Sequence, residues 1–293
     1  MTMAQDVAPA TIPPRRIRTR RIEFDYPVDE LPRHFVSGDP VMSSVVAVLS
    51  SLFPEGEDFF VRSVRNYRDR ISDPELKKQV GGFIGQESIH GREHREFNER
   101  LQSLGYPTRF IDRGTKYGLG ALARILPKNR QLAITAALEH YTATLAETLL
   151  SDPEARDLLS VPEVQSLFLW HAVEESEHKS VAFDVYEAVC GSHWIRTMVM
   201  NGTTVVFLAV VVGGTTLSLL LNGHTYRHPV RTLRNVARLR SSPWLGRDVI
   251  RRLRDYNRRG FHPDDHDATA LLEEWRAKLF GDSGTLADRL KAG

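Results

Sequence analysis

Two segments, Glu87-Ser-Ile-His90 and Glu175-Ser-Glu-His178, decide the fold of this chain, because each repeats the spacing Glu-x-x-His within a long helical pattern. Residues three positions apart lie on the same face of an α-helix, so each segment presents a carboxylate beside an imidazole. One such motif from each of two helices, with one glutamate from each of two others, forms a di-metal centre inside a four-helix bundle. The sequence therefore predicts an all-α fold and a function in metal chemistry.

The four helices of this bundle can be placed between residues 40 and 190, where no stretch alternates like a β-strand. Asp73 before Pro74 is a strong helix start, because the side chain caps the first turn and proline fits the first helical position. The predicted helical bounds are 41–71 with an interruption at 53–56, then 74–104, 128–150 and 161–190. The predicted divisions of the chain are a flexible basic arm at 1–30, the di-metal bundle at 31–192, an apolar helical segment at 193–223 and a basic helical carboxyl-terminal region at 224–293.

The glutamates of these helices lie at matching heights. If the first two helices form an antiparallel hairpin, residues equidistant from the turn at residue 72 sit level, and Glu57 and Glu87 are equidistant from it. Glu139 and Glu175 have their midpoint at residue 157, inside the connection between the third and fourth helices. Both pairs therefore favour one shared site.

The helical angles bring further donors to this site. At about 100° per residue, His171 and His178 share one helix face with Glu175, and His94 shares another with Glu87 and His90. Charged groups on apolar helix faces need a compensating cation. The predicted metal ligands are Glu57, Glu87, His90, Glu139, His171, Glu175 and His178.

Four residues near this set have alternative interpretations. Glu55 competes with Glu57, which is favoured by its height, and Glu174 competes with Glu175, which completes the Glu-x-x-His spacing. His94 is either an additional ligand or, as we prefer, a second-layer donor that orients a carboxylate. His140 points about 100° away from Glu139 and is predicted to be structural.

Oxygen and nitrogen donors must hold the metal, since the single cysteine, Cys190, cannot build a thiolate site or an intrachain disulfide. This donor set suits iron, manganese or zinc, and its many carboxylates favour iron or manganese. The lone cysteine also predicts a reducing compartment. No apolar run in the first thirty residues resembles a cleavable signal, so a cytoplasmic location is predicted.

The motif-bearing stretches around Glu57, Glu87–His94, Glu139–Thr142 and His171–Lys179 resemble the bacterial family known as predicted metal-dependent hydrolases. The resemblance covers most of residues 35–280. It implies a ferritin-like four-helix bundle with additional carboxyl-terminal helices and two bound metal ions, with iron as the first candidate and manganese or zinc as others. More distantly, the pattern His171-x-x-x-Glu175-x-x-His178 is similar to the three-histidine pattern of the di-iron arylamine N-oxygenases. Carried over by position, all seven predicted ligands match that set.

These resemblances lead us to expect an enzyme that activates O2 to oxidise a small, hydrophobic organic substrate, with electrons from a separate donor. The alternative is a hydrolase in which the two metals activate water. A third interpretation is a metal-binding protein without catalytic activity.

Residues 197–221 are uncharged and long enough to span a bilayer. Three placements remain open: a core helix that lines a substrate channel, association with a membrane without crossing, and a true span. Arginines are frequent at both ends of the chain although the net charge is only +2, so an anionic membrane surface is a candidate partner. No motif for a specific nucleic acid is present.

Overall fold

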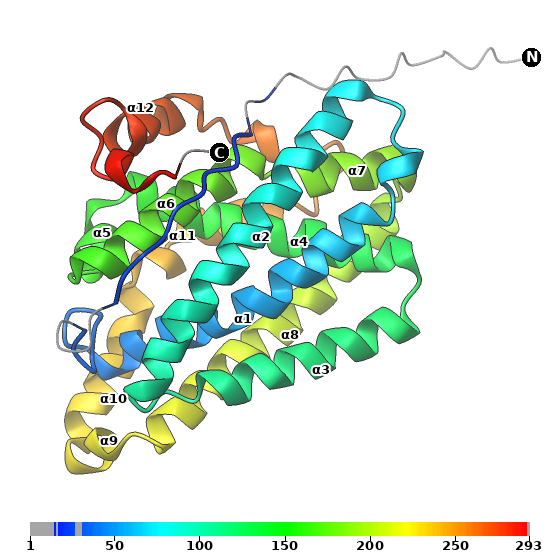
Figure 1. Cartoon of the computed structure of the whole chain (residues 1–293). Helices are drawn as coiled ribbons and strands as arrows, with labels where there is room; N and C mark the ends of the chain where they lie inside the picture. The colour runs from blue at the N-terminus through cyan, green and yellow to red at the C-terminus, as the bar shows by residue number, and fades with distance from the viewer. Residues whose placement is uncertain (1–14, 16, 27–30, 292–293) are drawn as a thin grey trace, which may run out of the picture.

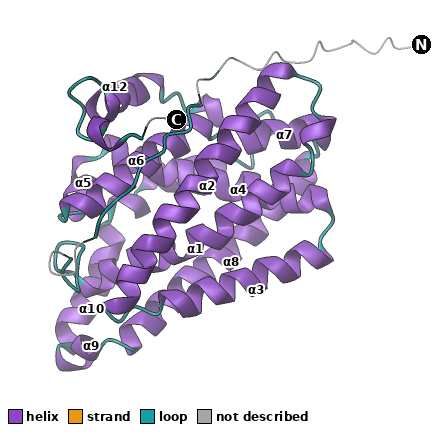
Figure 2. Ribbon diagram, viewed as in Figure 1, coloured by secondary structure: helices purple, strands orange, loops and turns teal. Residues whose placement is uncertain are grey.

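The structure, a computed structural model, describes residues 15, 17–26 and 31–291, and within these ranges it contains helices and loops but no strand (Figure 2). The all-α prediction is confirmed. The α-helices, as labelled in Figure 1, are α1 (Pro40–Arg65), α2 (Pro74–Ser103), α3 (Thr108–Ile125), α4 (Lys128–Ser151), α5 (Pro153–Leu158), α6 (Pro162–His178), α7 (Val181–Val189), α8 (His193–Leu220), α9 (Gly223–Arg227), α10 (Pro229–Arg238), α11 (Arg247–Asp255) and α12 (Thr269–Phe280). Short 3-10 turns lie at Arg68–Arg70, Leu239–Ser241, Pro243–Leu245, Pro263–Asp265 and Ala287–Arg289.

Four long helices form the centre of the molecule as two hairpins, with α1 against α2 and α4 against α6. Contacts between α1 and α4 and between α2 and α6 join the hairpins into a bundle. One apolar cluster contains Phe97 and Trp170, and another contains Phe83 and Tyr186. The predicted ligand positions fall between these two clusters along the helices, so apolar layers flank them.

Helix α1 runs without a break through Pro54, where the sequence predicted an interruption. A proline inside a helix removes the hydrogen bond to the carbonyl group four residues earlier. Here that carbonyl belongs to Ser50, and it accepts a hydrogen bond from Asn98 Nδ2 of α2 at 2.9 Å. This contact between helices replaces the lost bond, so α1 continues and carries Glu57 into the centre of the bundle.

The predicted fourth helix at 161–190 is two helices, α6 and α7, separated at Lys179 and Ser180. The Lys179 ammonium donates to Glu147 Oε1 of α4 at 2.8 Å, and the Ser180 hydroxyl donates to Asp264 Oδ1 at 2.6 Å. These bonds tie the break to α4 and to the carboxyl-terminal region. The expected ligands of α6 all precede the break.

Part of the predicted arm at 1–30 packs on the bundle, so for residues 17–26 the prediction of a flexible arm is wrong. Ile22 and Phe24 are buried, because they pack into the apolar core around Trp170. A Cβ atom at Gly85 of α2 would lie only 2.2 Å from Thr19 Oγ1, so glycine permits this close approach. Residues 1–14, 16 and 27–30 lie outside the described part of the chain.

Two different outer layers cover the bundle. Helices α3 and α8 pack on α1, and α8 also packs on α4, whereas α12 packs on α6 (Figure 1). The segment predicted to be apolar and helical, 193–223, forms α8 and the start of α9. Helix α8 contacts the bundle with one face and leaves most of its surface exposed, so it is not enclosed in the core.

Candidate metal centre

The structure brings all seven predicted ligands together in the middle of the bundle. Helix α1 supplies one, α2 two, α4 one and α6 three. None of these side chains belongs to a residue more than 4% exposed. They form three overlapping groups whose ligand atoms lie within 4.8 Å of one another: Glu57, His90 and His171; Glu87, His90 and Glu175; and Glu87, Glu139 and His178.

Two glutamates connect the groups. Glu175 Oε1 lies 2.8 Å from His171 Nε2, 3.4 Å from His90 Nδ1 and 3.6 Å from His178 Nε2. Glu87 Oε1 lies 3.0 Å from His178 Nε2 and 3.7 Å from His90 Nδ1. Each of these carboxylates therefore faces imidazoles that belong to different groups, as expected of residues shared by two metal positions.

Many polar atoms of this cluster are buried without a hydrogen-bond partner. Among the residues that the structure describes, both carboxylate oxygens of Glu57, Glu87 and Glu139 are in this state, as are Glu175 Oε2, His90 Nδ1 and His178 Nε2. Contacts as short as that between His178 Nε2 and Glu87 Oε1 lack the alignment of a hydrogen bond. Buried polar atoms normally have hydrogen-bond partners. A concentration of unpaired carboxylate oxygens and imidazole nitrogens therefore fits a site that binds cations.

Hydrogen bonds on the outer side of two imidazoles fix the ring nitrogen that faces the carboxylates. His90 Nε2 lies 3.0 Å from the Glu174 carboxylate and donates to it, so Nδ1 is the nitrogen that faces the cluster. The Gln86 amide nitrogen donates to Glu177, so its oxygen accepts from His178 Nδ1 at 2.8 Å, and Nε2 is the nitrogen that faces the cluster. His90 Nδ1 and His178 Nε2 therefore both point to the acidic cluster, where a proton or a metal ion can occupy them.

The third imidazole follows the same rule through a longer chain. The Ser50 hydroxyl donates to Asn98 Oδ1, so it accepts from His94 Nδ1 at 2.9 Å. His94 Nε2 is then bare and accepts from His171 Nδ1 at 2.7 Å, which leaves His171 Nε2 bare beside Glu175. An unprotonated imidazole nitrogen and a carboxylate oxygen that face each other repel one another. Either a proton or a metal cation between them removes this repulsion.

The pKa values of the carboxyl groups show the same need for positive charge. Burial raises the pKa of Glu57 well above its usual value, and the charge of Glu87 adds to the shift. Burial likewise raises the pKa of Glu139 to about 8, helped by Glu87 and Glu175. Burial also opposes ionisation of Glu175, but His178 and the other imidazoles outweigh it and hold that pKa well below its usual range.

The histidines respond in opposite ways. Burial disfavours a charged imidazole, yet Glu174 and Glu175 outweigh burial at His90 and raise its pKa to about 10. At His171, burial and the neighbouring His90 lower the pKa to about 4. Without metal, protons therefore occupy the cluster in part, and metal binding must release them.

A swapped arrangement orients the two Glu-x-x-His motifs. The residue before the glutamate of each motif bonds the histidine of the other motif, since Gln86 contacts His178 and Glu174 contacts His90. The carboxylates of α6 continue the network, because Glu174 and Glu177 both accept hydrogen bonds from Arg20 at 2.7–2.9 Å. Sequence reasoning missed the roles of Gln86 and Arg20. The polar residue directly before each motif was the available signal for Gln86.

The remaining candidates lie outside the ligand groups. Glu55 is 3.4 Å from the Lys116 ammonium and contributes no atom to the three groups. His94 Nε2 lies 2.7 Å from His171 Nδ1, so it contacts an imidazole where the sequence suggested a carboxylate. His140 bonds the Arg252 carbonyl at 2.8 Å, and burial lowers its pKa to about 3, so it has a structural environment.

A family model described as "Predicted metal-dependent hydrolase" matches residues 18–267, which include the whole cluster. The chain belongs to this family. The comparison with curated proteins found no match, and neither did the comparison with solved structures. Membership confirms the first resemblance seen in the sequence, whereas the similarity to the arylamine N-oxygenases and the ferritin-like relationship stay predictions. The family description agrees with the hydrolase alternative and gives no support to oxygen activation.

Proposed function

We propose that the seven-residue cluster binds two metal ions and that the protein is a metal-dependent hydrolase. The observation that carries this proposal is the set of carboxylate oxygens and imidazole nitrogens that face one another, without hydrogen-bond partners, in a fully buried site. The family description supports hydrolysis as the reaction. Bound metal ions would lower the pKa of a water molecule and polarise the scissile group of the substrate.

The protein's own residues would hold and orient this centre. Glu57, His90 and His171 would form one binding position, and Glu87, Glu139 and His178 the other. Glu175 contacts imidazoles of both positions and would be shared between them. Glu174, Gln86 and His94 would keep the three imidazole rings in the tautomers that leave a bare nitrogen toward the metal.

Oxygen activation is the second candidate. It is favoured by the excess of carboxylates over imidazoles, four against three, because such oxygen-rich sets favour iron or manganese over zinc. Under this candidate, the same seven residues would hold redox-active metal ions, and an electron donor would be needed.

Metal replacement separates the two candidates. The protein would be stripped with a chelator, reloaded with zinc or with ferrous iron, and tested with a panel of chromogenic esters and phosphate esters with and without O2. Hydrolysis by the zinc form, or by the iron form under anaerobic conditions, would support the proposal. Consumption of O2 by the reduced iron form, together with an inactive zinc form, would contradict it and favour oxygen activation.

Two glutamates on the same helix provide a matched pair of variants. Glu57→Gln changes a predicted ligand, whereas Glu55→Gln changes a carboxylate two residues away that pairs with Lys116. We expect hydrolysis to be lost in Glu57→Gln and kept in Glu55→Gln. Equal activity in both variants would place the reaction elsewhere.

A further inference from the structure

One side of the molecule exposes an unusually apolar helix. In the described part of the chain, α8 is the one helix long and apolar enough to cross a membrane, and only 17% of its most apolar window is buried. Isolated exposed apolar residues are common on soluble proteins, but a continuous helical surface of them marks an interaction site. The most exposed apolar side chains of α8 and its end are Trp194, Val205, Val206, Val212, Leu220 and Leu221.

A narrow face attaches α8 to the bundle. The Ser218 hydroxyl donates to Ser44 Oγ of α1 at 3.0 Å, and the Tyr141 hydroxyl of α4 donates to Thr204 Oγ1 at 2.8 Å. At its first turn, Arg196 is buried and donates to the carbonyl of Arg258 at 3.0 Å. A helix that is fixed along its length in this way would lie along a membrane surface rather than cross the membrane.

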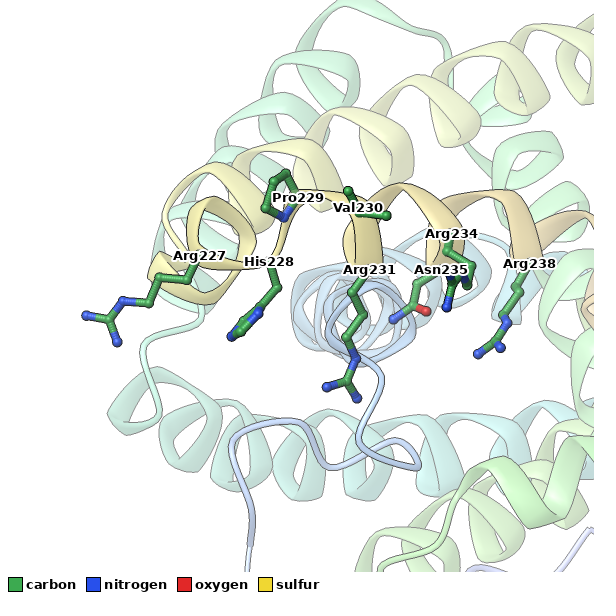
Figure 3. Close-up of a pocket in the computed structure, with 8 residues that line it drawn as sticks. All are labelled: Arg227, His228, Pro229, Val230, Arg231, Arg234, Asn235 and Arg238. Atoms are coloured by element: carbon green, nitrogen blue, oxygen red, sulfur yellow. The ribbon is translucent and has the colours of Figure 1, made fainter.

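Helix α10 follows α8 through the short α9 and has three distinct faces. At about 100° per residue, residues 232 and 235 fall on one side, and both are buried toward α1. Val230 and Leu233, each 69% exposed, lie with Val236 on a second face. The third face carries Arg231, Arg234 and Arg238, and Figure 3 shows Arg227, Arg231 and Arg238 extending to the same side of the helix.

In the part of the chain that the structure describes, no carboxylate pairs with these arginines. The stretch from residue 188 to residue 247 contains seven arginines and no Asp or Glu. Within the described residues, no ion pair involves Arg227, Arg231, Arg234 or Arg238. Together with Asn235 they line a pocket of about 600 Å³ (Figure 3). Guanidinium groups bind phosphate groups with paired hydrogen bonds, so this pocket suits an anionic headgroup.

We propose that α8 and α10, which we call the α8–α10 surface, dock on a membrane leaflet that contains anionic phospholipids. Apolar side chains beside uncompensated arginines are the composition of a helix that lies in the membrane interface. The arginines would contact lipid phosphates while Val206 and Leu233 enter the acyl region. Nucleic acid would be attracted by the same charges but would not need the exposed valines and leucines.

Binding of the full-length, metal-loaded protein to vesicles tests this proposal. We expect strong co-sedimentation with vesicles of equimolar phosphatidylcholine and phosphatidylglycerol, and weak co-sedimentation with phosphatidylcholine alone. The triple variant Arg227→Gln, Arg231→Gln and Arg238→Gln should lower the partition coefficient about a hundredfold, since each arginine near an anionic surface contributes about fivefold. The matched control changes three exposed arginines to glutamine in the last turns of α1 and the 3-10 turn that follows it, namely Arg62, Arg65 and Arg68.

The apolar part of the surface has its own test. Val206→Asn combined with Leu233→Asn should lower vesicle binding at least about tenfold, because each side chain loses its transfer into the acyl region. Ile250→Asn on α11 is the control, since this residue is also exposed and apolar. Both sets of variants should keep the metal content of the wild type, so failure here leaves the proposed function untouched.

Four results of the binding experiments would overturn the docking proposal, and a fifth comes from carbonate extraction. The four are no binding to either vesicle, an equal loss in the arginine control, unchanged binding in the asparagine double variant, and release of the protein from anionic vesicles by duplex DNA that the asparagine variant binds equally well. Resistance of the vesicle-bound protein to alkaline carbonate would also overturn it, because α8 would then cross the membrane.

Discussion

The metal-ligand cluster and the α8–α10 surface both concentrate charge of one sign, but they differ in what can balance it. The four carboxylates of the cluster are buried, so only groups inside the bundle can compensate them. The arginines of α10 face solvent, where water and counterions compensate them. The comparison teaches that the cluster must couple to folding, whereas the surface can change what the protein binds and leave its stability unaltered.

The largest effect is expected from removing a proposed ligand that two of the groups share. Glu87→Ala deletes a carboxylate that belongs to two of the ligand groups, so metal affinity should fall by more than about a hundredfold. The metal content of the purified protein, measured by mass spectrometry, should fall close to zero. His140→Ala, which changes a buried histidine outside the groups, should keep the metal. Equal metal content in both variants would show that the cluster does not bind the metal more strongly than its surroundings do.

The pH dependence of stability should separate the metal-free and metal-loaded states. Without metal, the pKa values of Glu139 and His90 are about 8 and about 10, above their ordinary values of 4.5 and 6.5. Groups with a raised pKa stabilise the folded state while protonated, and this contribution is lost as the pH rises through those values. His171, with a pKa lowered to about 4, changes its contribution only below about 6.5.

We therefore expect the Tm of the chelated protein to fall between about pH 7 and about pH 10. The metal-loaded protein should change much less, because cations replace the protons. Calorimetry on both forms would measure the difference. A parallel decline of the two curves would show that the cluster does not control this pH dependence.

A smaller effect is expected one layer outside the ligands. Glu174→Gln keeps the shape of the side chain that orients His90 but removes the charge that Arg20 and His90 both contact. Metal affinity should fall about tenfold to a hundredfold, measured by competition with a chelator of known affinity. Glu163→Gln, a change near the start of the same helix, should have no such effect. An unchanged affinity in Glu174→Gln would limit the site to its seven ligands.

The smallest effect on stability is expected at the surface. Leu233→Asn changes a residue that is 69% exposed, so the free energy of unfolding should change by no more than about 0.5 kcal/mol. Urea unfolding would measure this, and vesicle binding of the same sample should fall. A loss of stability above about 2 kcal/mol would mean that the Leu233 side chain packs within the protein, so that it does not belong to a solvent-facing surface.

The clustering of the seven predicted ligands could be predicted because helical geometry constrains it twice. The spacing of Glu87 and His90 fixes the angle, and the distances of Glu57 and Glu87 from residue 72 fix the height. Both constraints act within one hairpin, where chain connectivity determines which residues meet. The confirmed all-α fold follows from the same periodicity.

Other features depend on contacts that periodicity does not contain. The continuity of α1 at Pro54 rests on a bond from Asn98, and the packing of residues 17–26 rests on Arg20 and Ile22 reaching α6 and the core. Each contact joins residues far apart in the sequence, so no local sequence pattern predicts it. The exposure of α8 was likewise undetermined, because an apolar run is equally compatible with a core helix and with a surface helix.

Metal stoichiometry tests the central claim most directly. The purified protein would be stripped, reloaded separately with ferrous iron, manganese and zinc, and desalted before its metal content is measured beside that of Glu57→Gln and Glu55→Gln. We predict about two ions per chain in the wild type and in Glu55→Gln with at least one metal, and a clear loss in Glu57→Gln. No retained metal in the wild type, or the same content in all three proteins, would contradict the account.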